Sequence, residues 1–322
     1  MPRTDCYDIF NGDADGICAL HQLRLAEPRE TSLITGVKRD IRLLSRVDGL
    51  RQAELTVLDI SLDSNRAALL SLLASSCRVF YVDHHYAGDI PANPLLTANI
   101  DPSPEVCTSL IVDTLLGGRY RGWAVAAAFG DNLHDAAHKA AASLALPNTQ
   151  VAMLRELGEL MNYNGYGQDL ADLHIRPDAL YHAVAPFADP IAFCAHSEIP
   201  AQLRQGFQDD LKRARQEQPL FTSRQGRIYR FPAEKWCRRV AGVFSNEKAR
   251  EMPDAAHALL VDNGDDSVMV SVRAPLARKQ GADTLCRAFT TGGGRAAAAG
   301  INALPVNEID IFCTSFNEVF SV

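Results

Sequence analysis

The chain has 322 residues, a net charge of −7 and a hydrophobic fraction of 47%. Its length predicts two domains rather than one compact core, and its apolar content excludes a disordered or fibrous protein. No segment approaches the roughly 20 apolar residues that a membrane span needs, and the start, MPRTDCYDIFNG, lacks the pattern of a secretory signal, so we expect a cytoplasmic protein without a membrane partner.

The first part of the chain alternates between β-rich and helical segments. Short runs rich in Val, Ile, Leu and Phe predict strands at 6–10, 31–37, 55–60, 78–83 and 95–100. Apolar residues spaced by three and four predict helices at 16–27, 65–76 and 104–116. Strands that alternate with helices indicate an α/β fold, with a parallel sheet flanked by helices.

The later part of the chain predicts a different organisation. Helical patterns cover about 123–145, 149–162 and 170–195, and a polar, helix-prone segment runs from 199 to 218 before Pro219. The runs RIYRF, HALLVD and VMVSVRAP then predict strands around a helix at 234–249. We therefore predict a first domain at 1–195, a connecting helix at 196–219 and a smaller, mixed α+β domain at 220–322.

The eight cysteines do not form a recognisable framework. They are scattered, contain no CxxC pair, and several lie inside apolar runs. Free, buried thiols in a reducing compartment explain this distribution better than disulfides or a zinc site.

The first candidate site is FNGDADG at 10–16, which follows the first predicted strand. In extended backbone the side chains of Asp13 and Asp15 leave the same face, so they can converge on a pair of cations. Gly12 and Gly16 permit a tight turn from strand to helix. The alternative is a surface turn with a helix cap.

Two further carboxylates follow apolar segments. Asp59 comes after the run LTVL, and Asp131 lies in AAFGDN. Asp59 could instead cap a helix, although Ser61 or Asp63 could serve equally well. Asp131 could be a helix-end carboxylate without a function.

Asp83, His84 and His85 close the buried run RVFYV and carry the strongest signal. Two adjacent imidazoles at the end of a strand are difficult to explain as core residues. One can bind a metal while the other faces a substrate, and Asp83 can orient an imidazole. Carboxylates and imidazoles together suit Mn²⁺ or Mg²⁺ sites that hold phosphate oxygens. Because the carboxyl ends of parallel strands share one edge of a sheet, these motifs predict a metal-dependent phosphoester hydrolase.

A second glycine-rich motif, GGGRAAAAG, lies near the end of the chain. Gly292, Gly293 and Gly294 can expose backbone N–H groups, and the alanine run predicts a helix whose positive end faces an anion. Arg273 and Arg295 could each clamp a phosphate. The alternative is a flexible loop.

The order GDADG, LDIS, DHH, GDN, VSVR and GGGRAAAAG resembles the DHH phosphoesterase family with its DHH-associated C-terminal domain, over about residues 7–303. That family includes RecJ-type single-strand exonucleases, oligoribonucleases and phosphatases that act on small nucleotides. The resemblance implies a catalytic first domain, a substrate-binding second domain and two Mn²⁺ ions, with Mg²⁺ as the alternative.

By the same resemblance each motif receives a role. Asp13 and Asp59 would hold one ion, while Asp15, Asp59, His84 and Asp131 would hold the other. The two ions would activate water for an in-line displacement. His85 would contact the scissile phosphate or assist the leaving group, with Asp83 beside it.

Two positions depart from the family pattern. Asn11 lies where many members carry histidine or aspartate, and an amide is a weaker ligand, so one ion is expected to bind less tightly. Arg295 replaces a histidine at the end of the glycine motif. This position has a permanent cation in place of a titratable ring. The exchange bears on which substrate is bound more than on whether hydrolysis occurs.

The predicted reaction is Mn²⁺-dependent hydrolysis of phosphodiester or phosphomonoester bonds in short oligonucleotides or nucleotides. Residues 220–322 have a net charge of +2, which leaves −9 for residues 1–219, so a broad basic surface for long duplex DNA is not expected. Two alternatives stay open: an exonuclease on longer single-stranded nucleic acid, and a non-catalytic nucleotide-binding or regulatory protein. The sequence does not determine the oligomeric state and is compatible with a homodimer.

Overall fold

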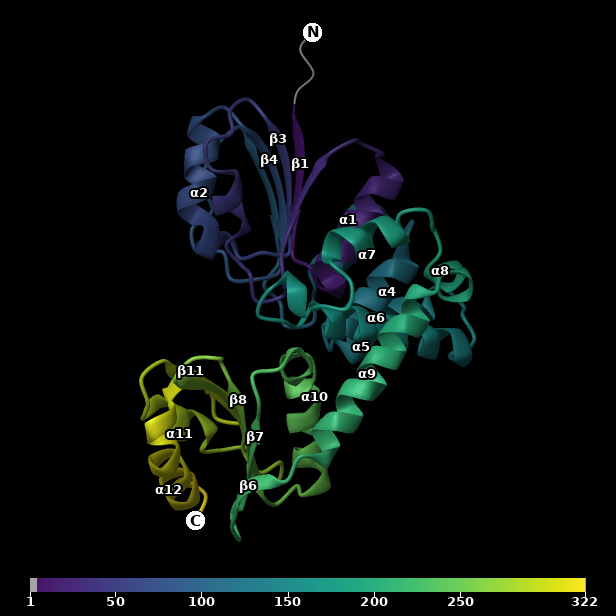
Figure 1. The fold of residues 1–322 in the computed structure, drawn as a ribbon. Coiled ribbons are helices and arrows are strands. Elements are labelled where there is room, and N and C mark those ends of the chain that lie inside the picture. Colours follow the sequence, from purple (N-terminus) through teal and green to yellow (C-terminus); the bar gives the residue numbers. More distant parts are fainter. Residues whose placement is uncertain (1–4, 322) are drawn as a thin grey trace. The chain divides into compact units, whose positions relative to one another are not determined.

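The computed structural model describes residues 5–321 and divides into two compact units, residues 1–205 and residues 206–322 (Figure 1). The division falls inside helix α9 (Ile199–Gln216). Within residues 5–321, every helix is too short or too polar to cross a membrane.

The first unit is built on a parallel five-stranded sheet with the strand order β2-β1-β3-β4-β5. This confirms the predicted α/β fold class with helices on both faces of a parallel sheet. The strands are β1 (Cys6–Phe10), β2 (Ser32–Thr35), β3 (Glu54–Leu58), β4 (Arg78–Asp83) and β5 (Leu96–Ile100).

Neighbouring residues of each strand supply the cores on opposite faces of this sheet. Phe10 and Leu58 pack into the larger core, against the helices that follow β1 and β5. Ile9 and Val57 pack into the second core, on the side of helix α2 (Leu62–Ala74). All four side chains are fully buried, which explains why the strands read as continuous apolar runs rather than as alternating ones.

The helices of the first unit lie on both sides of its sheet, with α2 on one side and α1, α4 and α7 on the other (Figure 1). The predicted helical segment at 123–145 consists of two helices, α4 and α5. The helices are α1 (Ala14–Ala26), α2 (Leu62–Ala74), α3 (Thr108–Leu115), α4 (Arg121–Gly130), α5 (His134–Ala142), α6 (Asn148–Gly165), α7 (Pro177–Val184) and α8 (Pro190–His196), with short 3₁₀ turns η1 (Leu43–Val47) and η2 (Leu170–Asp172).

Helices α4 and α6 approach each other closely at Gly130 and Gly158. A Cβ atom on Gly158 would lie 1.8 Å from the backbone oxygen of Ala126, and one on Gly130 would lie 2.7 Å from the backbone oxygen of Gly158. Only glycine fits such a contact between two backbones. The close crossing fixes the end of α4, where Asp131 follows.

The second unit is a mixed six-stranded sheet with the order β10-β11-β9-β8-β7-β6. Helix α10 covers one face, and α11 and α12 cover the other (Figure 1). Its elements are β6 (Pro219–Thr222), β7 (Gly226–Phe231), α10 (Lys235–Glu251), β8 (Ala256–Asp262), β9 (Ser267–Arg273), α11 (Ala282–Arg287), β10 (Gly292–Arg295), β11 (Ala298–Pro305), η3 (Val306–Glu308) and α12 (Ile309–Val319).

The prediction of a helix after the three glycines is wrong. The glycines form strand β10, and the alanine run forms β11, which pairs with β10 and β9. Ala299 and Ile301 alternate into the core of this unit, and this packing overrides the helix propensity of alanine. A Cβ atom on Gly292 would lie 1.7 Å from the backbone oxygen of Cys286, so this glycine permits close packing of two backbone segments rather than opening a helix.

A buried histidine in α1 predicts a loss of stability in acid. His21 is 1% exposed, and its Nε2 lies 2.7 Å from the Phe187 carbonyl oxygen. Burial lowers the pKa of His21 to about 4, whereas an unfolded histidine titrates near 6.5. The unfolded state therefore binds more protons between these values, so the stabilisation is present above about pH 6.5 and is lost as the pH falls towards 4.

We expect this histidine to make the unfolding free energy about 2 kcal/mol smaller at pH 5 than at pH 8. Urea unfolding of wild type and His21→Gln at both pH values measures the effect, because the glutamine cannot titrate. An equal pH dependence in the two proteins would contradict the assignment.

Candidate metal centre

The acidic motifs meet at the carboxyl edge of the parallel sheet. The chain runs from β1 to β2 on one side and continues at β3 on the other, so the order of the strands reverses between β1 and β3. Asp13 and Asp15 follow β1, and Asp59 follows β3. Such a reversal is where open α/β sheets hold their ligands.

Histidine and aspartate donor atoms come close together at this edge. Atoms of Asp15, His84 and Asp131 lie within 4.8 Å of one another, and so do atoms of Asp59, His84 and His85. His84 Nε2 is 3.5 Å from Asp59 Oδ1 and 3.6 Å from Asp131 Oδ2. We refer to Asp15, Asp59, His84 and Asp131 as the ligand cluster.

The backbone fixes which nitrogen of His84 can bind a cation. His84 Nδ1 lies 2.9 Å from the carbonyl oxygen of Val106. A carbonyl only accepts hydrogen bonds, so Nδ1 carries the proton and donates it. Nε2 is then left with its lone pair directed towards the carboxylates, which is the usual arrangement of a metal-binding histidine.

The start of helix α3 holds the Asp15 carboxylate in place. The backbone N–H groups of Thr108 and Ser109 each donate to one Asp15 oxygen, both at 2.7 Å. The Thr108 hydroxyl lies 3.3 Å from Asp59 Oδ1, to which it donates. These donors are neutral, and each carboxylate oxygen has a second lone pair, so both side chains can still bind a cation.

Asp59 occupies a backbone conformation that is uncommon for its residue type. Its φ is +58°, in the left-handed region, which costs a residue with a side chain roughly 1 kcal/mol. The alternative role as a helix cap is filled by Ser61, whose Oγ accepts from the N–H of Ser64. A strained residue beside other acidic groups is typical of a functional position.

The charges of the cluster are incompletely balanced. Burial, followed by the nearby charges of Asp15 and Asp13, raises the pKa of Asp59 well above its usual value. Burial and Asp15 also raise the pKa of Asp131. A cation among these carboxylates would stabilise their ionised forms, so the donor set fits a divalent metal ion.

Asp13 lies beside the cluster and has its own cationic partner. Its Oδ1 accepts from the N–H groups of Asp15 and Gly16, so it caps α1 as the structural alternative expected. Its Oδ2 lies 2.5 Å from Lys38 Nζ. Burial opposes ionisation of Asp13, yet Lys38 and the cap hydrogen bonds lower its pKa.

His85 and Asp83 form a pair at the margin of the cluster. His85 Nδ1 lies 2.7 Å from Asp83 Oδ1, and the Asp83 side chain is completely buried. This hydrogen bond, despite partial burial, raises the pKa of His85. The His85 side chain is 41% exposed, so its ring is held by Asp83 and still reaches solvent.

The predicted substrate-binding residues of the second unit are arranged differently from the expected phosphate loop. Arg273 pairs with Ala298, which pairs with Arg295, so the two arginines share a cross-strand row and leave the same face of the sheet. Arg273 Nε donates to Asn246 Oδ1 at 2.9 Å, whereas Arg295 is exposed. Gly292, Gly293 and Gly294 belong to β10, the strand of Arg295.

Sequence reasoning did not identify Lys38, Thr108 or Ser109. Lys38 directly follows the predicted strand at 31–37. Because the carboxyl ends of parallel strands meet at one edge of the sheet, this position could have identified Lys38 as a residue of the site. Thr108 and Ser109 lay inside the predicted helix at 104–116. The helix begins only at Thr108, which leaves both N–H groups free to bind Asp15.

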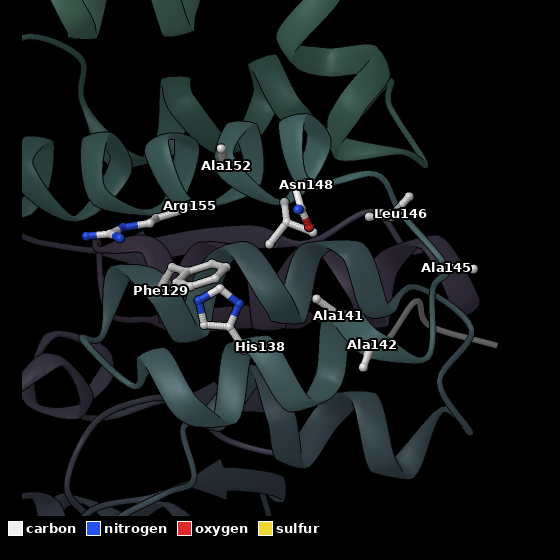
Figure 2. Close-up of a pocket in the computed structure, with 10 residues that line it drawn as sticks. Phe129, His138, Ala141, Ala142, Ala145, Leu146, Asn148, Ala152 and Arg155 are labelled. Atoms are coloured by element: carbon white, nitrogen blue, oxygen red, sulfur yellow. The ribbon is translucent and has the colours of Figure 1, made fainter.

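Another recess of the first unit has different chemistry. A pocket of about 340 Å³ lies between α5 and α6. Phe129, His138 and Arg155 line it beside alanine side chains (Figure 2). His138 packs edge-on against Phe129. No carboxylate lines this pocket in the described part of the chain, so it does not extend the ligand cluster.

The sequence matches no family model and no curated protein. Solved structures do match. A DHH domain described as belonging to a family of ribosomal proteins aligns over 98% of this chain and 86% of its own, with 12% identity and a TM-score of 0.66.

Two further solved structures extend this likeness. Exonuclease RecJ bound to manganese aligns over 98% of this chain and 90% of its own, with 15% identity and a TM-score of 0.62. PggH from Vibrio cholerae, a pGpG-specific phosphodiesterase, aligns over 98% and 99%, with 12% identity and a TM-score of 0.55. The resemblance predicted from the motifs is thus confirmed for the fold, which this chain shares with these DHH-domain structures.

Proposed function

We propose that this protein is a divalent-metal-dependent phosphoesterase that hydrolyses short oligonucleotides or nucleotides, with Mn²⁺ as its preferred ion. The observation that carries the proposal is the convergence of Asp15, Asp59, His84 and Asp131 on one small region. These residues come from distant parts of the chain, and three of them follow strands or helices whose ends position them rigidly.

The ligand cluster suits the chemistry of phosphate esters. Three carboxylates and one imidazole provide the oxygen and nitrogen donors that Mn²⁺ and Mg²⁺ accept. A bound divalent cation would acidify water and withdraw charge from phosphate oxygens. The N–H groups of Thr108 and Ser109 keep Asp15 oriented for that cation, and Val106 does the same for His84.

His85 is the best placed proton carrier in this proposal. Asp83 holds its Nδ1, so Nε2 remains for a substrate oxygen. Because the pKa of His85 is raised, the ring is more often protonated near neutral pH than a free histidine. It can then donate a hydrogen bond to a phosphate oxygen or a proton to the leaving group.

The substrate class is supported by charge and by the solved structures. A chain that is acidic over its first 219 residues lacks the overall charge that favours long duplex DNA. RecJ is an exonuclease and PggH is specific for the dinucleotide pGpG. We assign the metal centre to the first domain and phosphate binding by Arg273 and Arg295 to the second.

The test is product analysis with and without Mn²⁺. The panel contains a linear dinucleotide, 3′-phosphoadenosine 5′-phosphate, a cyclic dinucleotide, pyrophosphate and a long single-stranded oligonucleotide. We expect Mn²⁺-dependent hydrolysis of the dinucleotide or of the small nucleotide, faster than that of the long strand. Tight nucleotide binding without any product would instead favour a binding protein, and preferred degradation of the long strand would favour an exonuclease.

A further inference from the structure

Lys38 places a permanent positive charge beside the ligand cluster. Its Nζ lies 2.5 Å from Asp13 Oδ2, 2.8 Å from Asn162 Oδ1 and 3.3 Å from Asp131 Oδ1. An ammonium group has three N–H donors, so these three acceptors account for all of them. The side chain is 25% exposed, and its charged end is engaged rather than free in solvent.

The backbone of Lys38 is fixed as firmly as its tip. The Lys38 N–H donates to the carbonyl oxygen of Gly165 at 2.8 Å, and Asn11 Nδ2 donates to the Lys38 carbonyl oxygen at 3.1 Å. The Tyr166 ring centroid lies 5.7 Å from Nζ, within the range of a cation–π contact. Contacts at the backbone and at the ammonium group therefore both hold Lys38 in place.

Asp13 differs from Asp15 in the charge of its partners. One of its oxygens caps α1, and the other holds Lys38. Among residues 5–321, the hydrogen bonds to the Asp15 carboxylate oxygens come from the neutral backbone N–H groups of Thr108 and Ser109. A cation bound at Asp13 would have to displace the ammonium group of Lys38, which lies 2.5 Å from Asp13 Oδ2. Within the ligand cluster, Lys38 contacts Asp131 at the longer distance of 3.3 Å.

We infer that Lys38 serves as the second cation of the centre, so that the protein binds one divalent ion at the ligand cluster and none at Asp13. This inference rests on the proposed function, because it assumes that the cluster holds a divalent ion. Asn11 fits the same arrangement: its amide supports the Lys38 backbone and adds no charge that would attract another metal ion.

The experiment counts bound Mn²⁺. Metal-stripped, full-length protein is titrated with MnCl₂, and free Mn²⁺ is measured by electron paramagnetic resonance. We expect one ion per chain in wild type and two in Lys38→Met, which keeps the aliphatic stem and removes the charge. Lys139→Met, which removes an exposed lysine of the same unit, is the matched control and should bind one ion.

Asp13→Asn and Asp15→Asn separate the two carboxylates without depending on the Lys38 variant. Asp13→Asn should still bind one ion, and Asp15→Asn should bind none. Two ions in wild type, a single ion in folded Lys38→Met, or the loss of the ion in Asp13→Asn would each overturn the inference while leaving metal-dependent hydrolysis intact. If wild type binds no Mn²⁺, the proposed function itself fails, and the inference fails with it.

Discussion

Replacing Asp15 with asparagine should lower phosphoester turnover by about 10³-fold or more, because a bound divalent ion contributes several kcal/mol of transition-state stabilisation. The amide removes one negative charge from the ligand cluster. It can also accept only one of the two N–H bonds that Thr108 and Ser109 donate to the carboxylate. The measurement is kcat on the best substrate of the panel at saturating Mn²⁺.

The control for this variant is Asp135→Asn, which changes an exposed aspartate in α5. Its kcat should stay within about twofold of wild type, since isolated surface changes have small effects. Circular dichroism must show that Asp15→Asn is folded, because the lost hydrogen bond also costs about 1–2 kcal/mol of stability. A folded Asp15→Asn protein with wild-type turnover would remove Asp15 from the reaction.

Replacing Arg239 with methionine should reduce the unfolding free energy of the second unit by about 3–5 kcal/mol. Arg239 in α10 binds Asp210 in α9 through two hydrogen bonds, of 2.6 and 3.1 Å. Both side chains are less than a tenth exposed. Without the guanidinium group, Asp210 would remain buried without its cation, and that uncompensated charge is the source of the loss.

The same pair of helices provides a matched control for this prediction. Arg215 of α9 binds Glu247 of α10 with the same two-pronged geometry, but the Arg215 side chain is 54% exposed. Arg215→Met should therefore cost less than about 1 kcal/mol. Urea unfolding compares the two variants. Equal losses of unfolding free energy in both would show that burial does not determine the strength of these pairs.

The double variant Asp210→Leu/Arg239→Met removes both charges of the buried pair. It should therefore recover much of the stability that Arg239→Met loses.

The location of the candidate site follows from the sequence because it depends on strand ends. The runs before Asp13, Asp59 and Asp83 are apolar, and parallel strands bring their carboxyl ends to one edge. Residues that are far apart in the chain could therefore be placed together without coordinates. Asp131, which follows a helix rather than a strand, was a candidate because of the apolar run before it, and the likeness of the motifs to a known family assigned it to the metal site.

The details of the site depend on contacts that no local pattern reveals. That His84, and not its neighbour, presents a free nitrogen to the carboxylates follows from the Val106 carbonyl. The role of Lys38 depends on the ends of α6 and of β2 lying close together. The alanine run after the three glycines was predicted as a helix because the local propensity of alanine is helical, yet pairing with β9 makes it a strand.

The most direct test of the central claim is hydrolysis by metal-stripped protein before and after Mn²⁺ is restored. A divalent ion at Asp15, Asp59, His84 and Asp131 predicts no turnover of any panel substrate in the presence of a chelator, and turnover that rises to saturation as one equivalent of Mn²⁺ binds. Undiminished hydrolysis by the fully stripped protein would contradict the account, since the ligand cluster would then have no part in the reaction.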